Sequence, residues 1–128
     1  MLYNTTPWVT LGRIHDRERG EMHLLWWRVH GSHFNDVGKL YQNINVTLIG
    51  AGAYAPAWFM APMHQNSYDV LNAFVATRAK IFIPFHYGTF DLADEPLGEP
   101  EQILNQLKAE GKIENDLNIL KLGEVFPC

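Results

Sequence analysis

Apolar and polar positions follow the clearest pattern from residue 46 onward. A short apolar run at 46–49 leads into a Gly-Ala-Gly sequence, the pattern of a buried strand that ends in a loop. A second apolar run at 81–85 predicts another buried strand, and Pro84 within it indicates a sheet edge or a strand end. A third strand is expected at 118–122.

Two helices are expected between these strands. Asn66 or Ser67 can cap a helix that continues to about residue 78, because apolar residues then recur every three to four positions. Pro100 suits the first turn of a second helix at about 101–110. The alternation of strand and helix predicts an α/β fold in which the strands share one sheet and both helices pack on one side of it.

The first 45 residues are less regular, being rich in His, Arg, Trp and Asn. Apolar patches at 24–27 and 37–41 indicate a short strand and a helical turn. The aromatic stretch at 54–62 contains prolines and is interpreted as a packed loop. The chain therefore changes character near residue 46.

Composition narrows the class of protein. The hydrophobic content of 47% is that of a globular domain, and the net charge of −4 gives no reason to expect a nucleic-acid partner. The only cysteine is Cys128, so neither a disulfide nor a thiolate cluster for zinc can form within the chain. No apolar run is long enough to span a bilayer and no signal peptide is recognised, so a cytoplasmic location is expected.

Three stretches of the second part resemble one protein family in their order and spacing. They are residues 52–60 (GAYAPAWFM), 64–66 (HQN) and 86–90 (HYGTF), and the last is followed by 95–100 (EPLGEP). They are similar to the Gly-Ala-Tyr loop, the His-containing segment before a helix and the His-Trp-Gly-Thr-Phe loop of metallo-β-lactamase-fold hydrolases. The branch is that of N-acyl-phosphatidylethanolamine phospholipase D and ascorbate-6-phosphate-lactonase-like proteins.

The resemblance implies an αββα sandwich with one or two metal ions, usually zinc, between its sheets. In that family a metal-bound hydroxide attacks a phosphodiester, a lactone or a similar ester of a small or lipid-like molecule. Residues 46–128 would form the C-terminal half of such a sandwich, and residues 1–45 form a segment that matches the family poorly.

The resemblance also implies roles for individual residues. His86 corresponds to the last metal-ligating histidine, and His64 would line the pocket, where it could act as an acid or polarise the substrate. The pocket wall and the tight turn beneath the metal are implied for four further residues: Tyr54, Trp58, Gly88 and Thr89. By spacing alone, His86 is more simply a hydrogen-bonded histidine at a strand end, and His64 is equally well a surface residue.

Several family features are missing from the sequence. No His-x-His-x-Asp-His motif is present, the position of the metal-bridging Asp falls on Trp27, and Ala57 replaces the usual Arg. His30 and His33 are three residues apart, but the intervening Gly-Ser favours a loop with solvated histidines over a ligand pair. Of the expected metal ligands only His86 is found, so weak zinc binding or none is expected for this chain.

Four carboxylates between residues 91 and 99 admit two interpretations. A structural or capping role is favoured over an acid/base cluster for Asp91, Asp94, Glu95 and Glu99. Trp26 and Trp27 are expected to be core or interface residues.

Three hypotheses about function therefore stay open. The chain is a truncated or degenerate hydrolase that is inactive alone, a non-catalytic interaction subunit, or the product of a gene fragment or misplaced start. Half of a sandwich leaves one sheet face uncovered, which predicts a homo-oligomer or a partner that supplies the missing N-terminal half. We expect Trp26, Trp27 and the uncovered side of the strands to be buried by another chain or by the N-terminal segment.

Overall fold

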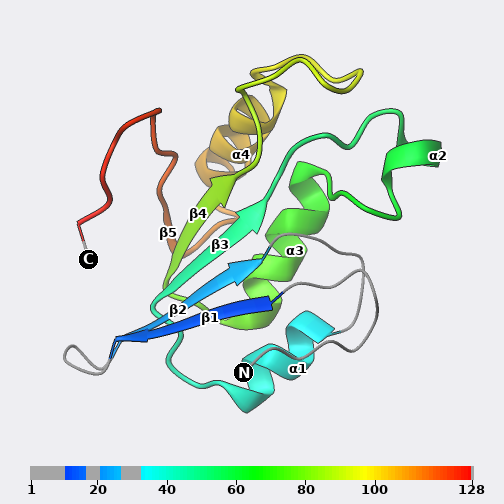
Figure 1. Ribbon diagram of the computed structural model, residues 1–128. Helices are drawn as coiled ribbons and strands as arrows, with labels where there is room; N and C mark the ends of the chain where they lie inside the picture. Colours follow the sequence, from blue (N-terminus) through cyan, green and yellow to red (C-terminus); the bar gives the residue numbers. More distant parts are fainter. Residues whose placement is uncertain (1–10, 17–20, 27–32, 128) are drawn as a thin grey trace.

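The computed structural model describes residues 11–16, 21–26 and 33–127 (Figure 1). The elements in chain order are β1 (Leu11–Asp16), β2 (Glu21–Trp26), α1 (His33–Leu40), β3 (Val46–Gly50), α2 (Ala57–Met60), α3 (Ser67–Thr77), β4 (Ile81–Phe85), α4 (Glu99–Ala109) and β5 (Asp116–Leu117). Within these ranges no helix is both long and apolar enough to cross a membrane.

The strands form one sheet in the order β1-β2-β3-β4-β5. β1 runs antiparallel to β2, whereas β2, β3, β4 and β5 run parallel to one another. Strands and helices alternate from β2 onward, so the predicted α/β class is confirmed, as are the strands expected at 46–49 and 81–85. The division of the chain at residue 46 stays a prediction, although β1 and β2 belong to the same sheet as the later strands.

The strand predicted at 118–122 was placed too late in the chain. β5 contains only Asp116–Leu117, and the last hydrogen bond to β4 is donated by the Asn118 N–H to the Phe82 carbonyl at 2.9 Å. A turn follows, in which the Lys121 N–H donates to the Glu124 carboxylate at 2.9 Å. Leu122 is 87% exposed, so its apolar character marks neither a strand nor the core.

Pro84 lies where β4 has an open edge. The carbonyls of Lys80 and Phe82 accept hydrogen bonds from the β5 side, whereas Phe85 bonds to Ala51 on the β3 side. Pro84 shares the side of Lys80 and Phe82, because alternate residues of a strand bond to the same neighbour. It lies beyond the short β5, so its missing N–H removes no hydrogen bond from the described sheet.

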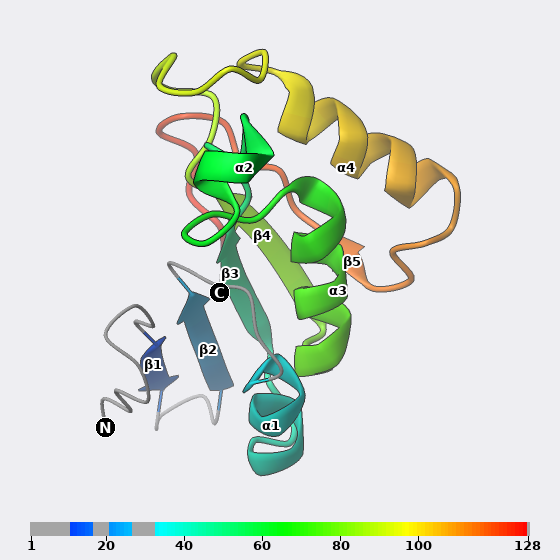
Figure 2. The same ribbon diagram turned by 90° about the vertical axis from the view of Figure 1, so that its right-hand side faces the viewer.

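Both predicted helices are confirmed and lie on one side of the sheet (Figure 2). Phe74 of α3 stacks on Phe82 of β4 with 4.9 Å between ring centroids, and Phe82 is fully buried. Such a pair adds about 0.5–1.5 kcal/mol to the stabilisation from buried area. Leu104 and Leu107 of α4 extend the same core. The helices thus hold β3 and β4 rigidly and fix the loops at their carboxyl ends.

The two apolar patches in the first 45 residues form the expected strand and helical turn. The patch at 24–27 falls mostly in β2, and the patch at 37–41 falls mostly in α1. Trp27 lies outside the described residues. The stretch at 54–62 is mainly loop, as predicted, but it contains the one-turn helix α2.

The N-terminus of α3 allows a test of the predicted helix cap at Asn66. The Asn66 side-chain oxygen accepts hydrogen bonds from the N–H groups of Tyr68 and Asp69, both at 3.0 Å. Asn66→Ala should therefore lower the free energy of unfolding by about 1 kcal/mol, measured by urea denaturation. Asn72→Ala on the exposed face of α3 is the control and should leave it nearly unchanged. Equal losses in both variants would contradict a capping role.

Candidate functional site

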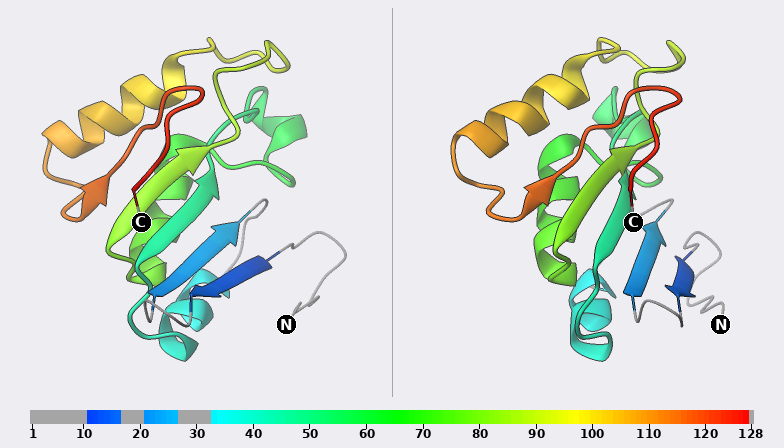
Figure 3. Two further views of the ribbon diagram at one scale, coloured as in Figure 1. Left: turned by 60° about the vertical axis from the view of Figure 1, so that its left-hand side comes forward. Right: turned by 90° about the vertical axis from the view of Figure 1, so that its left-hand side faces the viewer.

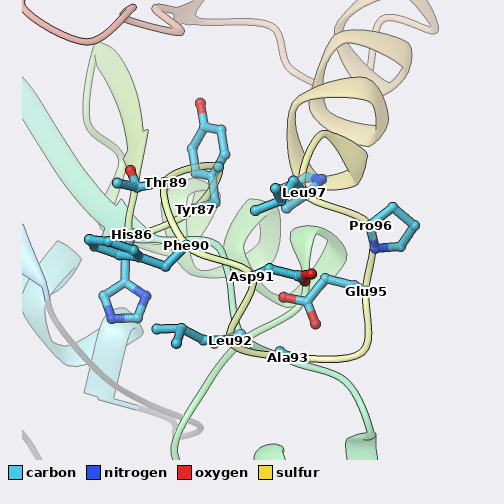
Figure 4. Close-up of a pocket in the computed structure, with 13 residues that line it drawn as sticks. His86, Tyr87, Thr89, Phe90, Asp91, Leu92, Ala93, Glu95, Pro96 and Leu97 are labelled. Carbon is cyan, nitrogen blue, oxygen red and sulfur yellow. The ribbon is translucent and has the colours of Figure 1, made fainter.

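The candidate site lies at the carboxyl ends of the parallel strands β3 and β4. The loop at 51–56 follows β3, and the loop at 86–98 follows β4, so both begin at the same edge of the sheet. A cavity of about 330 Å³ lies against the second loop. It is lined by Ala53, His86, Tyr87, Gly88, Thr89, Phe90, Asp91, Leu92, Ala93, Glu95, Pro96, Leu97 and Pro100. Figure 4 shows this loop curving round the cavity, from His86 at its start to Glu95 and Pro96 on the far side.

Gly52 brings the two loops into direct contact. A Cβ atom built on Gly52 would lie 2.2 Å from the His86 carbonyl oxygen and 2.9 Å from the Tyr87 Cβ. Only glycine permits this approach without displacement of the backbone. His86 itself has a φ of 63°, in the left-handed region, so the chain turns sharply as it leaves β4.

The two predicted site histidines lie next to each other. The rings of His64 and His86 have centroids 5.5 Å apart and are tilted by 37°. His64 is placed by the turn after α2, where its N–H donates to the Met60 carbonyl at 2.9 Å. His86 is placed by β4, so residues 22 positions apart in the sequence meet at one edge of the sheet.

The tight turn expected after His86 is present. Gly88 has a φ of 75°, a conformation that other residues rarely adopt, and both Gly88 and Thr89 line the cavity. Tyr54 and Trp58 are not among the residues that line it. Trp58 of α2 is 83% exposed, so the assignment of Tyr54 and Trp58 to a pocket wall stays a prediction.

Two tyrosines near the site are held in the neutral form. Burial raises the pKa of Tyr87 to about 12, with a further contribution from the Glu101 carboxylate. Burial also raises the pKa of Tyr54, and the carboxylate of Glu99 raises it further. The Tyr54 hydroxyl makes no hydrogen bond of regular geometry with the described residues. Both phenols therefore stay protonated well above neutral pH.

The chain is similar to known hydrolases over part of its length. It is 30% identical over 79 residues to the mitochondrial N-acyl-phosphatidylethanolamine-hydrolyzing phospholipase D of Saccharomyces cerevisiae, and 31% identical over 71 residues to phospholipase D 1 of that type from Caenorhabditis elegans. An uncharacterised protein of Mycobacterium tuberculosis is 32% identical over 74 residues. These matches cover 56 to 62% of this chain but only 17 to 19% of the relatives.

The fold has a counterpart of known structure. Igni18, a metallo hydrolase from the archaeon Ignicoccus hospitalis, superposes with a TM-score of 0.54 at 14% identity, covering 93% of this chain and 52% of Igni18. The resemblance to metallo-β-lactamase-fold hydrolases is confirmed. No family model matches the chain. The chain thus spans about half the length of Igni18.

A metallo hydrolase needs three or four metal ligands, and the described residues do not supply them. They contain no group of three His, Cys, Asp or Glu side chains arranged to hold a metal ion. His64 and His86 are an adjacent pair, but two imidazoles do not complete a zinc site. The metal centre of this hydrolase fold therefore does not fit the described residues alone.

Sequence reasoning missed two residues at the site. Tyr87 occupies the place of the Trp in the family's His-Trp-Gly-Thr-Phe loop, and this substitution was the available signal. Glu95 was assigned only a structural or capping role, without a partner. Its carboxylate in fact joins the two loops, which only their three-dimensional packing reveals.

The contact between Gly52 and His86 predicts that adding a methyl group at Gly52 destabilises the protein. Gly52→Ala places a Cβ against backbone rather than a flexible side chain, so the loops must separate. We expect a loss of about 1–3 kcal/mol in the free energy of unfolding, measured by urea denaturation. Gly98→Ala is the matched control, since its Cβ would lie 3.7 Å from the nearest atom, the Gln102 side-chain nitrogen. A Gly52→Ala protein as stable as the control would contradict the close approach.

Proposed function

We propose that this chain forms the C-terminal half of a metal-dependent hydrolase that cleaves a phosphodiester, a lactone or a related ester. The observation that carries this proposal is the His64–His86 pair, which lies beside a cavity at the carboxyl ends of β3 and β4. Over 71 to 79 residues, the chain is also similar to two phospholipases whose names state that they hydrolyse N-acyl-phosphatidylethanolamine.

The proposed roles follow from position. His86 directly follows β4 and serves as one metal ligand, with zinc as the proposed metal. His64, adjacent to it, binds the substrate and acts as an acid or polarises the scissile group. Leu92, Phe90 and Leu97 give the cavity an apolar wall suited to the hydrocarbon part of an ester.

The described residues supply only part of the proposed site. The remaining ligands would come from the other half of the sandwich, either in a longer chain or in a separate subunit. We place the activity in the cytoplasm, since the sole Cys128 offers no disulfide for an oxidising compartment to form.

A second candidate, a non-catalytic interaction subunit, is favoured by the sheet face opposite α3. Val46 aligns with Ile81 and Leu48 with Ile83, on the face opposite Thr47 and Phe82, which are turned toward the helices. Among the described residues only the C-terminal segment, and no helix, lies near that face (Figure 3). Val46 and Ile83 are already buried within the chain, whereas Leu48 and Ile81 stay partly exposed. An apolar sheet face of this kind packs well against a second sheet. We propose a second half-domain, in a homo-oligomer or a longer protein, as its partner.

A chimera tests the proposed hydrolase directly. In it, residues 46–127 of this chain replace their counterpart in the yeast phospholipase, whose remaining residues would supply the rest of the site. The chimera should hydrolyse N-acyl-phosphatidylethanolamine, and His86→Ala in the chimera should reduce kcat/KM by at least about 100-fold. The isolated chain supplied with zinc should show no hydrolysis above background.

The controls separate misfolding from a wrong function. Leu40 is exposed on α1, so Leu40→Ala is a control in the isolated chain. It should change neither the structure nor the zinc content of that chain. Circular dichroism establishes that the chimera is folded. A folded chimera without activity, or one that keeps full activity with His86→Ala, would contradict the proposal.

The proposed second half-domain predicts that the isolated chain forms a dimer in solution. The isolated chain should sediment above its own 14.7 kDa, because burial of the apolar sheet face favours a dimer. Leu48→Asp on that face should return it to a monomer, whereas Leu40→Asp on the exposed surface of α1 should not. A compact monomer of the unaltered chain at all concentrations would exclude self-association through this face.

A further inference from the structure

The carboxylate of Glu95 connects the two loops of the site at their rims. One oxygen accepts a hydrogen bond from the Tyr54 N–H at 3.2 Å, and the other accepts from the Ala55 N–H at 2.9 Å. The adjacent Asp94 N–H donates to the Ala55 carbonyl at 3.1 Å. The segment at 54–55 is therefore held at three points by two consecutive residues of the opposite loop.

These contacts are of the strong type. Hydrogen bonds to an ionised carboxylate are about twice as strong as those between neutral groups, and here both donors are backbone groups fixed in direction. Both hydrogen bonds are partly buried, which limits competition from water. A single side chain thus fixes two successive peptide groups.

The hydrogen bonds of Glu95 lie where they can fix the relative position of the two histidines. Gly52 and His86 are in contact where the loops begin, and Glu95 joins the same loops at their outer ends. The chain then runs from Ala55 through α2 to His64. Because the two loops are joined at both places, the loop that leads to His64 has a fixed position relative to the loop that begins at His86.

We propose that Glu95 is a positioning residue that keeps His64 beside His86. It acts through the backbone of residues 54–55 and does not touch the reacting atoms. The inference deepens the proposed function, from which it takes only the assumption that both histidines serve one site.

Glu95→Gln is the sharpest variant because it preserves size and shape. Gln offers one acceptor oxygen, and its NH₂ group would face a backbone N–H, donor against donor. The variant therefore loses one of the two hydrogen bonds and the charge of the other. Asp91→Asn is the matched control, since Asp91 is a carboxylate that lines the same cavity but is exposed.

The experiment is NMR on the full chain without added metal. In Glu95→Gln, hydrogen exchange at the Tyr54 and Ala55 amides should accelerate about tenfold or more. The ring-proton resonances of His64 and His86, which depend on the ring current of the neighbouring imidazole, should shift toward the values of separated rings. Asp91→Asn should leave both observables unchanged.

Two results would overturn the inference. The first is unchanged exchange at Tyr54 and Ala55, which would show that the carboxylate does not hold these peptides. The second is faster exchange with unchanged His64 and His86 resonances, which would leave Glu95 with a local structural role only. Neither readout uses metal, substrate or turnover, so failure of the proposed hydrolase activity would be recognised separately.

Discussion

The site depends first on the close backbone approach between Gly52 and His86. The loop after β3 can lie against the loop after β4 only because no Cβ occupies the space at Gly52. From that contact the second loop turns at Gly88, encloses the cavity and returns through Glu95 to the first loop. The second loop begins at His86 and the first leads through α2 to His64, and the two imidazole rings have centroids 5.5 Å apart.

The scaffold beneath these loops is an ordinary α/β core. Parallel strands place their carboxyl ends at one edge, and the helices on one face hold them there through contacts such as Phe74 on Phe82. Function at the carboxyl edge of a parallel sheet is a general consequence of this arrangement. None of the described helices lies on the other face of the sheet, where the C-terminal segment runs (Figure 2).

The sequence predicted the parts of the fold that rest on local signals. β4 was placed at its observed bounds because five apolar residues lie between polar ones, and α3 was placed by the Asn66 cap and its apolar stripe. β5 was misplaced because Leu120 and Leu122 imitate a strand, although the sheet pairing ends at Asn118. Apolar residues in a terminal segment can be exposed, as Leu122 is, so their pattern alone is ambiguous. At the site, the motifs indicated His64 and His86 separately. Their adjacency across 22 residues and the double hydrogen bond of Glu95 across 40 depend on loop packing, which no local pattern encodes.

The central claim is that the described residues bring His64 beside His86 at a cavity but hold only part of a metal site. The most direct measurement is the zinc content of the purified chain after dialysis, with the affinity determined by calorimetry. We predict substoichiometric zinc and weak binding, because two imidazoles hold the ion loosely and compete with protons. Stoichiometric zinc that survives dialysis and is lost in His86→Ala would contradict the claim, since it would show a metal site completed within this chain.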